Sequence, residues 1–279
     1  MFILILGIDA GNFKTKVVGK NGLMEFISAI GESRDVNLQQ IHGEDDMVFE
    51  YEGRRGFAGS LALYESEFGG SIMGDSKAHP DTKIRVLIAI HRYCTLYNLN
   101  DNVFQIILGQ PIVNHTPADK EFLKQMLCGQ HSITLNGVEK TFAITHCEIA
   151  AEGATSYFSN PQRGLVRIID LGSGTCNYAT LMEGRFIDKD SGTLTFGMNT
   201  NKTNDMFALS RGIVTNISKK WGKNDHVLIV GGAAEQLQPL IKEYFPNTHV
   251  LYPVYNNQYV SPVFANAVAF YNIAVNIYE

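Results

Sequence analysis

Short apolar runs near the start of the chain alternate with polar turn residues, which is typical of a meander of β-strands. The predicted strands are residues 2–8, 14–20 and 23–28. Asn21-Gly22 supplies the tight turn between the last two. Residues 29–78 contain more glycine and mixed charge, with one further hairpin signal. The pattern therefore predicts a sheet followed by a small inserted subdomain.

Beyond residue 78 the apolar spacing changes repeatedly between helical and strand periods, which predicts an α/β protein. The predicted helices are residues 80–97, 117–127, 148–158, 203–221, 233–244 and 263–277. The predicted strands are residues 103–108, 132–135, 138–144, 177–182, 185–190 and 226–230. Meander, helix, strand and helix occur in each half, so the pattern predicts two duplicated lobes with a cleft between them. Lobe I is residues 1–150 with 259–279, and contains 29–78 as its small subdomain; lobe II is residues 151–258.

The composition is that of an ordinary globular protein, with 45% hydrophobic and 18% charged residues and a formal net charge of −5. Direct binding to nucleic acid is not favoured, because counterion release needs clustered Lys and Arg. The four cysteines are far apart and form no C-x-x-C pair, which fits a reducing cytoplasm and predicts neither a metal knuckle nor a disulfide framework. The first apolar run is too short for a signal peptide, and no window approaches a membrane span.

Two copies of one motif carry the candidate chemistry, at residues 5–11 and 168–174. Each copy is an apolar strand that ends in Asp-x-Gly, with Asp9 in the first copy and Asp170 in the second. One such motif alone is typical of an ordinary hairpin turn. Two copies in matching contexts instead predict facing walls that hold a polyphosphate and its metal.

Small residues in these turns allow backbone N–H groups to approach phosphate oxygens. The glycines are Gly11, Gly172 and Gly174, and the added hydroxyl donors are Ser173 and Thr175. A bare carboxylate would repel phosphate, so the predicted role of Asp9 and Asp170 is to hold Mg²⁺ through water molecules. Lys16 is the preferred cation for the β- or γ-phosphate, and Lys14 is the competing choice.

Two further segments add candidates. Gly231-Gly232 separates a predicted strand from a predicted helix, an order that allows a ligand to approach the backbone closely. Glu148 begins a predicted helix ahead of Asp170, and its carboxylate is a candidate for orienting a water molecule. The alternative interpretation of Glu148 is a first-turn Glu favoured by the helix dipole, and Glu152 is an equally acidic alternative.

Together, five motifs resemble the actin, Hsp70 and sugar-kinase superfamily, whose members share a duplicated, ribonuclease H-like, two-lobe α/β fold. In chain order they are phosphate 1 at residues 8–11 with Lys16, connect 1 at 148–151, phosphate 2 at 168–175, adenosine at 229–234 and connect 2 at 266–273. The resemblance covers almost the whole chain. Each motif is weak alone, whereas the five in this order are highly specific.

Within the superfamily the chain most resembles the plasmid-segregation actins of the ParM group, which share its Ile-Ile-Asp-Leu-Gly phosphate 2 motif. The resemblance implies that Asp9 and Asp170 coordinate Mg²⁺. It also implies that Asp170 and Glu148 are the catalytic residues, and that Glu148 positions the attacking water. It implies phosphate or adenosine contacts for Gly11, Asn12, Lys16, Gly172, Ser173, Gly174, Thr175, Gly231, Gly232 and Ala233. The sequence departs from the group at Ala10 and Lys14, where small hydroxyl or amide residues are common.

Residues 197–221 leave room for about one helix where relatives insert the outer subdomain IIB. This shortage resembles the short AlfA type of plasmid-segregation actin, which lacks subdomain IIB. Helices near that subdomain usually complete the adenine pocket, so the resemblance leaves the base contacts open. The candidate substitutes, by position, are Lys202, Asn204, Asp205 and Arg211.

The implied function is an actin-like ATPase that polymerises with Mg²⁺ and ATP, or with GTP, in the cytoplasm. Such a filament segregates plasmid DNA through a DNA-binding adaptor protein bound to a plasmid centromere, without itself touching nucleic acid or membrane. Two alternatives remain open: a small-molecule kinase acting on a sugar or acid, and a scaffold that binds nucleotide without hydrolysing it. Residues 35–46 and 256–259 are candidate filament contacts, although solvated loops are the favoured interpretation.

Overall fold

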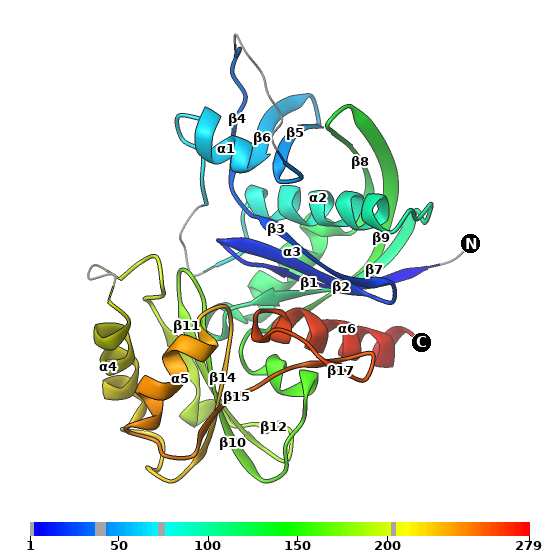
Figure 1. The fold of residues 1–279 in the computed structure, drawn as a ribbon. Helices are drawn as coiled ribbons and strands as arrows, with labels where there is room; N and C mark the ends of the chain where they lie inside the picture. The colour runs from blue at the N-terminus through cyan, green and yellow to red at the C-terminus, as the bar shows by residue number, and fades with distance from the viewer. Residues whose placement is uncertain (1–2, 37–42, 72–75, 202–204) are drawn as a thin grey trace.

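The computed structural model describes residues 3–36, 43–71, 76–201 and 205–279, which form two large mixed β-sheets covered by helices and one separate two-stranded sheet (Figure 1). The first sheet has nine strands, in the order β3-β2-β1-β7-β9-β8-β5-β6-β4, and the second has six, five of them in the order β12-β11-β10-β14-β15. In each sheet the central strand, β1 or β10, has a hairpin partner on one side and a parallel strand on the other. The structure therefore repeats one α/β unit, as the sequence predicts.

The first sheet and the helices packed on it are formed by the N-terminal elements of the chain. They are β1 (Leu4–Ala10), β2 (Lys14–Gly19), β3 (Gly22–Ile27), β4 (Ile30–Glu32), β5 (Asp46–Tyr51), β6 (Arg54–Gly59), α1 (Ser60–Glu65), α2 (Pro80–Leu96), β7 (Val103–Gln110), α3 (Pro117–Leu127), β8 (Gly129–Leu135) and β9 (Val138–Ala151). Strand β9 continues past the central strands to β8, so β5, β6 and β4 extend the same sheet into a small subdomain with α1.

The second sheet and the C-terminal elements follow. They are β10 (Leu165–Leu171), β11 (Cys176–Met182), β12 (Arg185–Phe186), β13 (Gly192–Leu194), α4 (Met206–Ile217), β14 (His226–Val230), α5 (Ala234–Lys242), β15 (Thr248–Val250), β16 (Val254–Tyr255), β17 (Gln258–Tyr259) and α6 (Ala265–Tyr278). Helices α4 and α5 pack together beside this sheet. The division into lobes at residues 151 and 259 stays a prediction.

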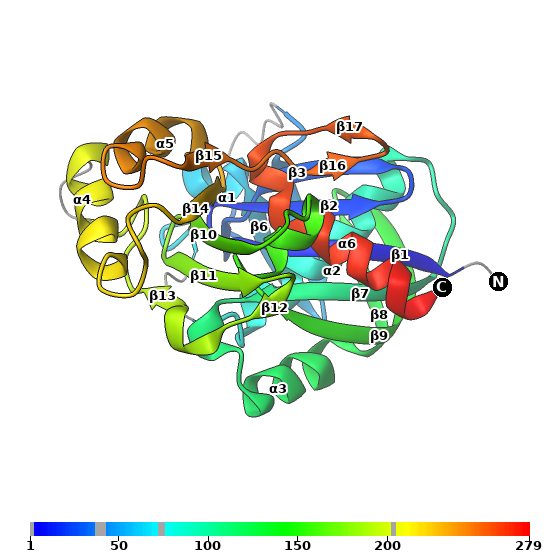
Figure 2. The same ribbon diagram turned by 90° about the horizontal axis from the view of Figure 1, so that it is seen from below.

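Strand β1 is buried along its whole length because helices cover both of its faces. Helix α2 packs on one side, and the C-terminal helix α6 lies across the other side against β1 and β7 (Figure 2). Gly7 permits the close approach of α6, since a Cβ at this position would lie 2.3 Å from the carbonyl oxygen of Ala267. The end of β1, which carries Asp9, is therefore fixed between two packed layers.

Local sequence signals explain several boundaries. The hairpin turns at Glu52, Asn136 and Glu183 each place a residue at positive φ followed by a glycine, the backbone that tight two-residue turns require. Helix α4 begins at Met206 because the side chain of Asp205 accepts hydrogen bonds from the backbone N–H groups of the first turn. It is shorter than the predicted helix 203–221, of which residues 203 and 204 lie outside the described residues.

The predicted helix at residues 148–158 is wrong. Strand β9 instead continues through Ala151, pairing in parallel with β7 as far as Gln110, and a 3-10 helix follows at Thr155–Ser159. Pairing with a buried neighbouring strand determines the conformation here, over the helical preference of the residues themselves. Because the segment is a strand and not a helix, its side chains point in other directions than predicted, and this alters the candidate site.

Candidate functional site

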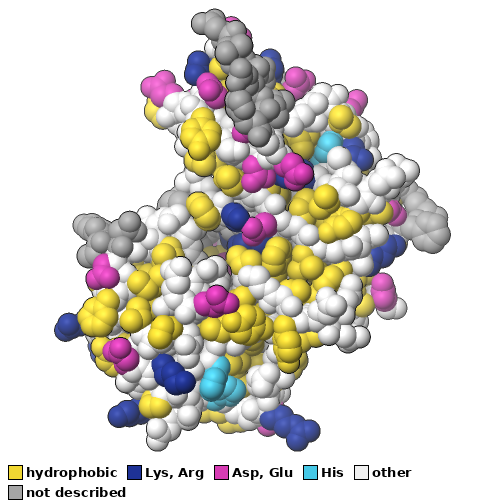
Figure 3. Space-filling view, in the orientation of Figure 1, with side chains coloured by type: hydrophobic (Ala, Val, Ile, Leu, Met, Phe, Trp, Pro, Cys, Tyr) yellow, Lys and Arg dark blue, Asp and Glu magenta, His cyan; other side chains and the backbone are white. Residues whose placement is uncertain are grey.

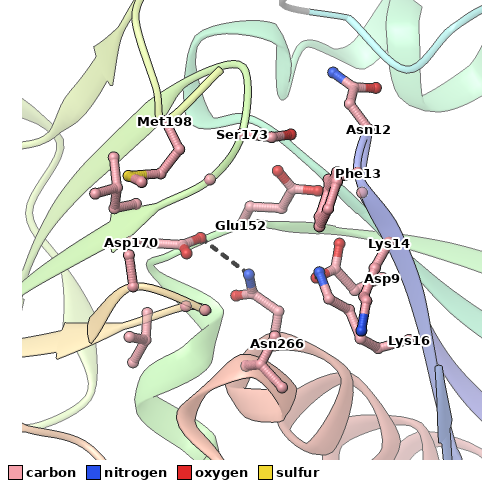
Figure 4. Close-up of a pocket in the computed structure, with 18 of the residues that line it drawn as sticks. Asp9, Asn12, Phe13, Lys14, Lys16, Glu152, Asp170, Ser173, Met198 and Asn266 are labelled. Carbon is pink, nitrogen blue, oxygen red and sulfur yellow. Dashed lines mark hydrogen bonds and ion pairs between the residues drawn. The ribbon is translucent and has the colours of Figure 1, made fainter. Parts of the chain in front are cut away.

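A cavity of about 550 Å³ lies between the two Asp-x-Gly turns, with walls from both sheets and from α6. Every predicted site residue except Glu148 lines it: Asp9, Gly11, Asn12, Lys16, Asp170, Gly172, Ser173, Gly174, Thr175, Gly231, Gly232 and Ala233. Figure 4 shows Asp9 and Lys16 on one side, Asp170 on the other, and Glu152 between them. The structure thus brings residues from distant motifs to one cavity.

Two lysines hold Asp9 at the end of β1. The ammonium group of Lys16 lies 3.2 Å from one carboxylate oxygen of Asp9, and that of Lys77 lies 3.3 Å from the other. Burial alone would raise the pKa of Asp9, but the two ammonium groups outweigh it and keep the pKa below its ordinary value. Asp9 is therefore a charged group whose two oxygens are both engaged.

Glu152 follows β9 and lies deep in the same cavity. Its carboxylate is in direct contact with the ammonium group of Lys77. Burial raises the pKa of Glu152 to about 7; Lys77 opposes this rise, and the nearby charge of Asp9 adds to it. Burial alone would lower the pKa of Lys77, but Glu152 and Asp9 raise it, so the lysine stays charged. A carboxyl group whose pKa lies near neutral pH is well suited to accept or hold a proton.

Asp170, at the end of β10, has no lysine within bonding distance among the ion pairs of the described residues. One of its oxygens accepts a 2.9 Å hydrogen bond from the side-chain amide of Asn266, which itself accepts a 3.1 Å bond from the backbone N–H of Gly153. Burial raises the pKa of Asp170, and the Asn266 hydrogen bond only partly opposes that effect. In the described part of the chain, therefore, no cation pairs with the carboxylate of this wall, and Lys16 and Lys77 act on it only from a distance.

The glycines keep side chains out of the cavity at tight turns. A Cβ at Gly11 would lie 2.7 Å from the carbonyl oxygen of Lys14. Gly231 has a φ of +97°, and a Cβ there would lie 2.7 Å from the carbonyl oxygen of Leu171. Any other residue would strain these turns, so both positions leave open backbone facing the cavity.

The structure does not bring Glu148 to this cavity, which corrects its predicted place. Glu148 lies within β9, and its carboxylate pairs with Lys124 of α3 at 2.7 Å with 47% of the side chain exposed. The side chain of Glu152 is only 10% exposed and lines the cavity. Had the segment been a helix, Glu148 and Glu152 would share a face. Because it is an extended strand that turns after Ala151, only Glu152 reaches the cleft.

Lys14 and Lys16 both line the cavity, but they have different partners. Lys14 contacts Glu25 of β3, whereas Lys16 pairs with Asp9. Sequence reasoning gave no role to Lys77 or Asn266. Asn266 stood within the segment that resembles connect 2, so a signal existed; Lys77 carried none, because it meets Asp9 only through the fold.

The carboxylates also fit the chemistry of a hydrated magnesium ion. Among the described residues, no three His, Cys, Asp or Glu side chains are grouped as a metal cage. Mg²⁺ usually binds one or two carboxylates and keeps water and phosphate oxygens as its other ligands. Asp170, which is buried and has no paired cation in the described ranges, and Asp9 opposite it are the side chains that would hold such an ion.

A protein-family model matches the part of the chain that contains Asp9 and Glu152. The family model described as the N-terminal domain of actin-like proteins matches residues 7–154, more than half of the 279 residues. The chain belongs to the actin-like proteins. No curated protein matches it in sequence.

Solved structures of other actin-like proteins resemble the whole chain. An AlfA filament bound to AMPPNP matches with a TM-score of 0.78 and 21% identity, covering 100% of both chains. Apo ParM of pSK41 gives 0.74 and 15%, covering 99% of this chain and 98% of that one. An archaeal actin homologue in complex with ADP gives 0.75 and 18%, covering 98% and 99%. The predicted actin-like fold is confirmed.

The stretch where this actin-like protein is short contains α4 as its one helix among the described residues between β13 and β14. Asp205 caps that helix and Arg211 is exposed; neither lines the cavity, and Lys202 and Asn204 lie outside the described residues. Met198 and Asn199, which precede the helix, line the cavity instead. No described helix is long and apolar enough to cross a membrane.

Proposed function

We propose that this chain is a nucleotide-dependent ATPase that assembles into actin-like filaments. The observation that carries the proposal is the cavity between the two Asp-x-Gly turns, which combines open glycine backbone, the buried Lys77, the partly buried Lys16 and three buried carboxylates. This combination suits a polyphosphate with a divalent cation. Nucleotide complexes of an AlfA filament and of an archaeal homologue with the same fold support it.

In the proposed reaction, Asp9 and Asp170 are the side chains that would hold Mg²⁺, and a bound ion would supply positive charge next to the phosphates. Backbone and hydroxyl donors of the turns, including Ser173 and Thr175, bind phosphate oxygens, and Gly231 to Ala233 line the nucleoside side. Glu152, rather than Glu148, orients the attacking water, because it lines the cavity and burial raises its pKa to about 7. ATP is the proposed nucleotide, with GTP as the alternative.

The proposed cellular role is segregation of plasmid DNA in the cytoplasm through a DNA-binding adaptor on a plasmid centromere. Filaments of AlfA with the same fold support self-assembly, and a head-to-tail contact that does not close into a ring gives a filament. The net charge is −5, and on the face in Figure 3 Lys and Arg side chains are dispersed among acidic ones. This distribution favours a protein adaptor over direct contact with DNA.

Purified protein with and without Mg-ATP, observed by electron microscopy and sedimentation, tests assembly, and phosphate release tests hydrolysis. We expect filaments that need nucleotide, and phosphate release without an added acceptor molecule. Glu152→Gln is expected to assemble but to release phosphate roughly 10²- to 10⁴-fold more slowly. The matched control, Glu148→Gln, is expected to behave as wild type. ADP formation that requires an added sugar or acid, with the phosphoryl group on that acceptor and no free phosphate, would instead indicate a kinase.

A further inference from the structure

Lys77 lines the cavity although it belongs to none of the sequence motifs. Its side chain is 7% exposed, and its ammonium group bridges Asp9 and Glu152, which lie 143 residues apart in the chain. These are the carboxylates on which the proposed metal and water positions depend. Lys77 is therefore a buried cation at the chemical centre of the cavity.

The backbone at Lys77 is fixed by the end of β7. The N–H of Lys77 donates a 2.9 Å hydrogen bond to the side-chain oxygen of Gln110, which is fully buried. The backbone carbonyl of Gln110 in turn accepts a 2.9 Å bond from the N–H of Glu152. One residue thus holds the lysine and the carboxylate together, so the placement of Lys77 beside Glu152 is part of the core and does not depend on a surface side chain.

A cation that binds Asp9 would compete with Lys77 for the carboxylate of Asp9. Both oxygens of Asp9 are engaged by lysines, Lys16 on one and Lys77 on the other. A divalent cation that approaches Asp9 must displace at least one of these contacts, because like charges repel at this distance in a buried site. Lys16 lies in β2 directly opposite Asp9, with its ammonium group beside Gly11. When Lys77 leaves Asp9, it still contacts Glu152. It is therefore the lysine that can turn towards a new anion and keep one carboxylate partner.

We propose that Lys77 makes this site selective for nucleoside triphosphates over diphosphates, by contacting the terminal phosphate. The inference rests on the proposed function. A nucleoside against Gly231 and Ala233 directs its phosphates towards Glu152, where the attacking water must meet the last phosphorus atom. Lys77 touches Glu152, so it lies beside a third phosphate, whereas a diphosphate ends short of it. The role is one of specificity, and Glu152 keeps the water.

Binding of AMPPNP and of ADP, each with Mg²⁺, tests this by isothermal titration calorimetry below the concentration at which light scattering detects assembly. The readout is the ratio of the ADP dissociation constant to that of AMPPNP, in which any general loss of affinity cancels. Lys77→Met is expected to lower this ratio roughly tenfold, the value of one lost charged contact. Lys77→Arg is expected to keep most of the preference. Lys83→Met, on α2 and paired with Glu52 outside the cavity, is the matched control and should leave the ratio unchanged.

Removing Lys77 leaves Asp9 and Glu152 with less compensation, so Lys77→Met with Glu152→Gln provides a second, charge-balanced variant. It is expected to fold and to lack the preference, while Glu152→Gln alone keeps it. An unchanged ratio in the double variant overturns the proposal, as does a wild-type protein that binds both nucleotides equally. Failure of the wild type to bind either nucleotide would instead contradict the proposed function itself.

Discussion

The two Asp-x-Gly turns have one sequence pattern and opposite electrostatics. Asp9 in the first sheet lies between two lysines and has a lowered pKa, whereas Asp170 in the second is held by a neutral amide and has a raised pKa. The two copies of the motif therefore share a backbone shape, but the charged groups around their aspartates differ. Among the described residues, two lysines pair with the carboxylate of the first wall, and a neutral amide bonds to that of the second.

The largest difference between the walls should appear in stability. Asp9→Asn leaves Lys16 and Lys77 beside a neutral amide in a buried site, which is expected to lower the free energy of unfolding by about 3 kcal/mol. Asp170→Asn, the matched change, removes a charge that burial already disfavours and is expected to cost less than about 1 kcal/mol. Urea unfolding without nucleotide measures both. Equal losses would remove the electrostatic distinction.

For nucleotide binding in the presence of Mg²⁺, Asp170→Asn should have the larger effect of the two substitutions. Asp170→Asn is expected to weaken nucleotide binding in the presence of Mg²⁺ roughly 10- to 100-fold, because the neutral side chain no longer attracts the hydrated ion. Wild-type protein treated with EDTA should lose affinity to a similar extent, and EDTA should have little further effect on the variant. Titration calorimetry of AMPPNP measures all three. A variant that retains the full magnesium effect would exclude Asp170 from the metal site.

A pH effect sharpens the comparison further. Burial raises the pKa of Glu152 from 4.5 to about 7, so the folded protein binds a proton that the unfolded chain releases between these values. Its contribution to stability therefore falls as the pH rises through that window. The lowered pKa of Asp9 acts in the opposite sense, with stability lost as the pH falls through its folded pKa.

Glu152→Gln tests this sign, because it removes the first of these groups. Between about pH 5 and about pH 7 the urea midpoint of the wild type should fall relative to that of the variant. The Glu148→Gln variant should follow the wild type. Parallel midpoints for the wild type and Glu152→Gln would mean that Glu152 titrates as an ordinary exposed carboxyl group.

The smallest effect is expected at Glu148, which is outside the cavity. Its pair with Lys124 is partly exposed, so Glu148→Gln should change stability by less than about 1 kcal/mol. Phosphate release should stay at the wild-type rate. A large loss of turnover in this variant would restore Glu148 as the water-positioning residue and contradict the arrangement in the cleft.

The sequence predicts the parts of this molecule that depend on local signals. The hairpin turns, the strand that carries Asp170 and the helix that begins at Pro117 require only alternation, glycine turns and a first-turn proline, and the structure contains them. The order of the five motifs also led to the correct fold. These features need no knowledge of which distant segments pack together.

The failures all involve long-range contacts. The segment at residues 148–151 is a strand because β7 pairs with it, so Glu148 lies outside the cavity and Glu152 lines it. Lys77 lies in a segment without a motif, and its partners are fixed by Gln110 at the end of another strand. Pattern reasoning therefore located the walls of the cleft but missed the cation between them.

The most direct test of the central claim is an experimental structure of the protein with AMPPNP and Mg²⁺. We predict that the phosphates lie between the turns of Asp9 and Asp170, with the ion on the Asp170 side and Glu152 nearest the terminal phosphate. Nucleotide bound elsewhere, or a terminal phosphate nearest Glu148, would contradict the account.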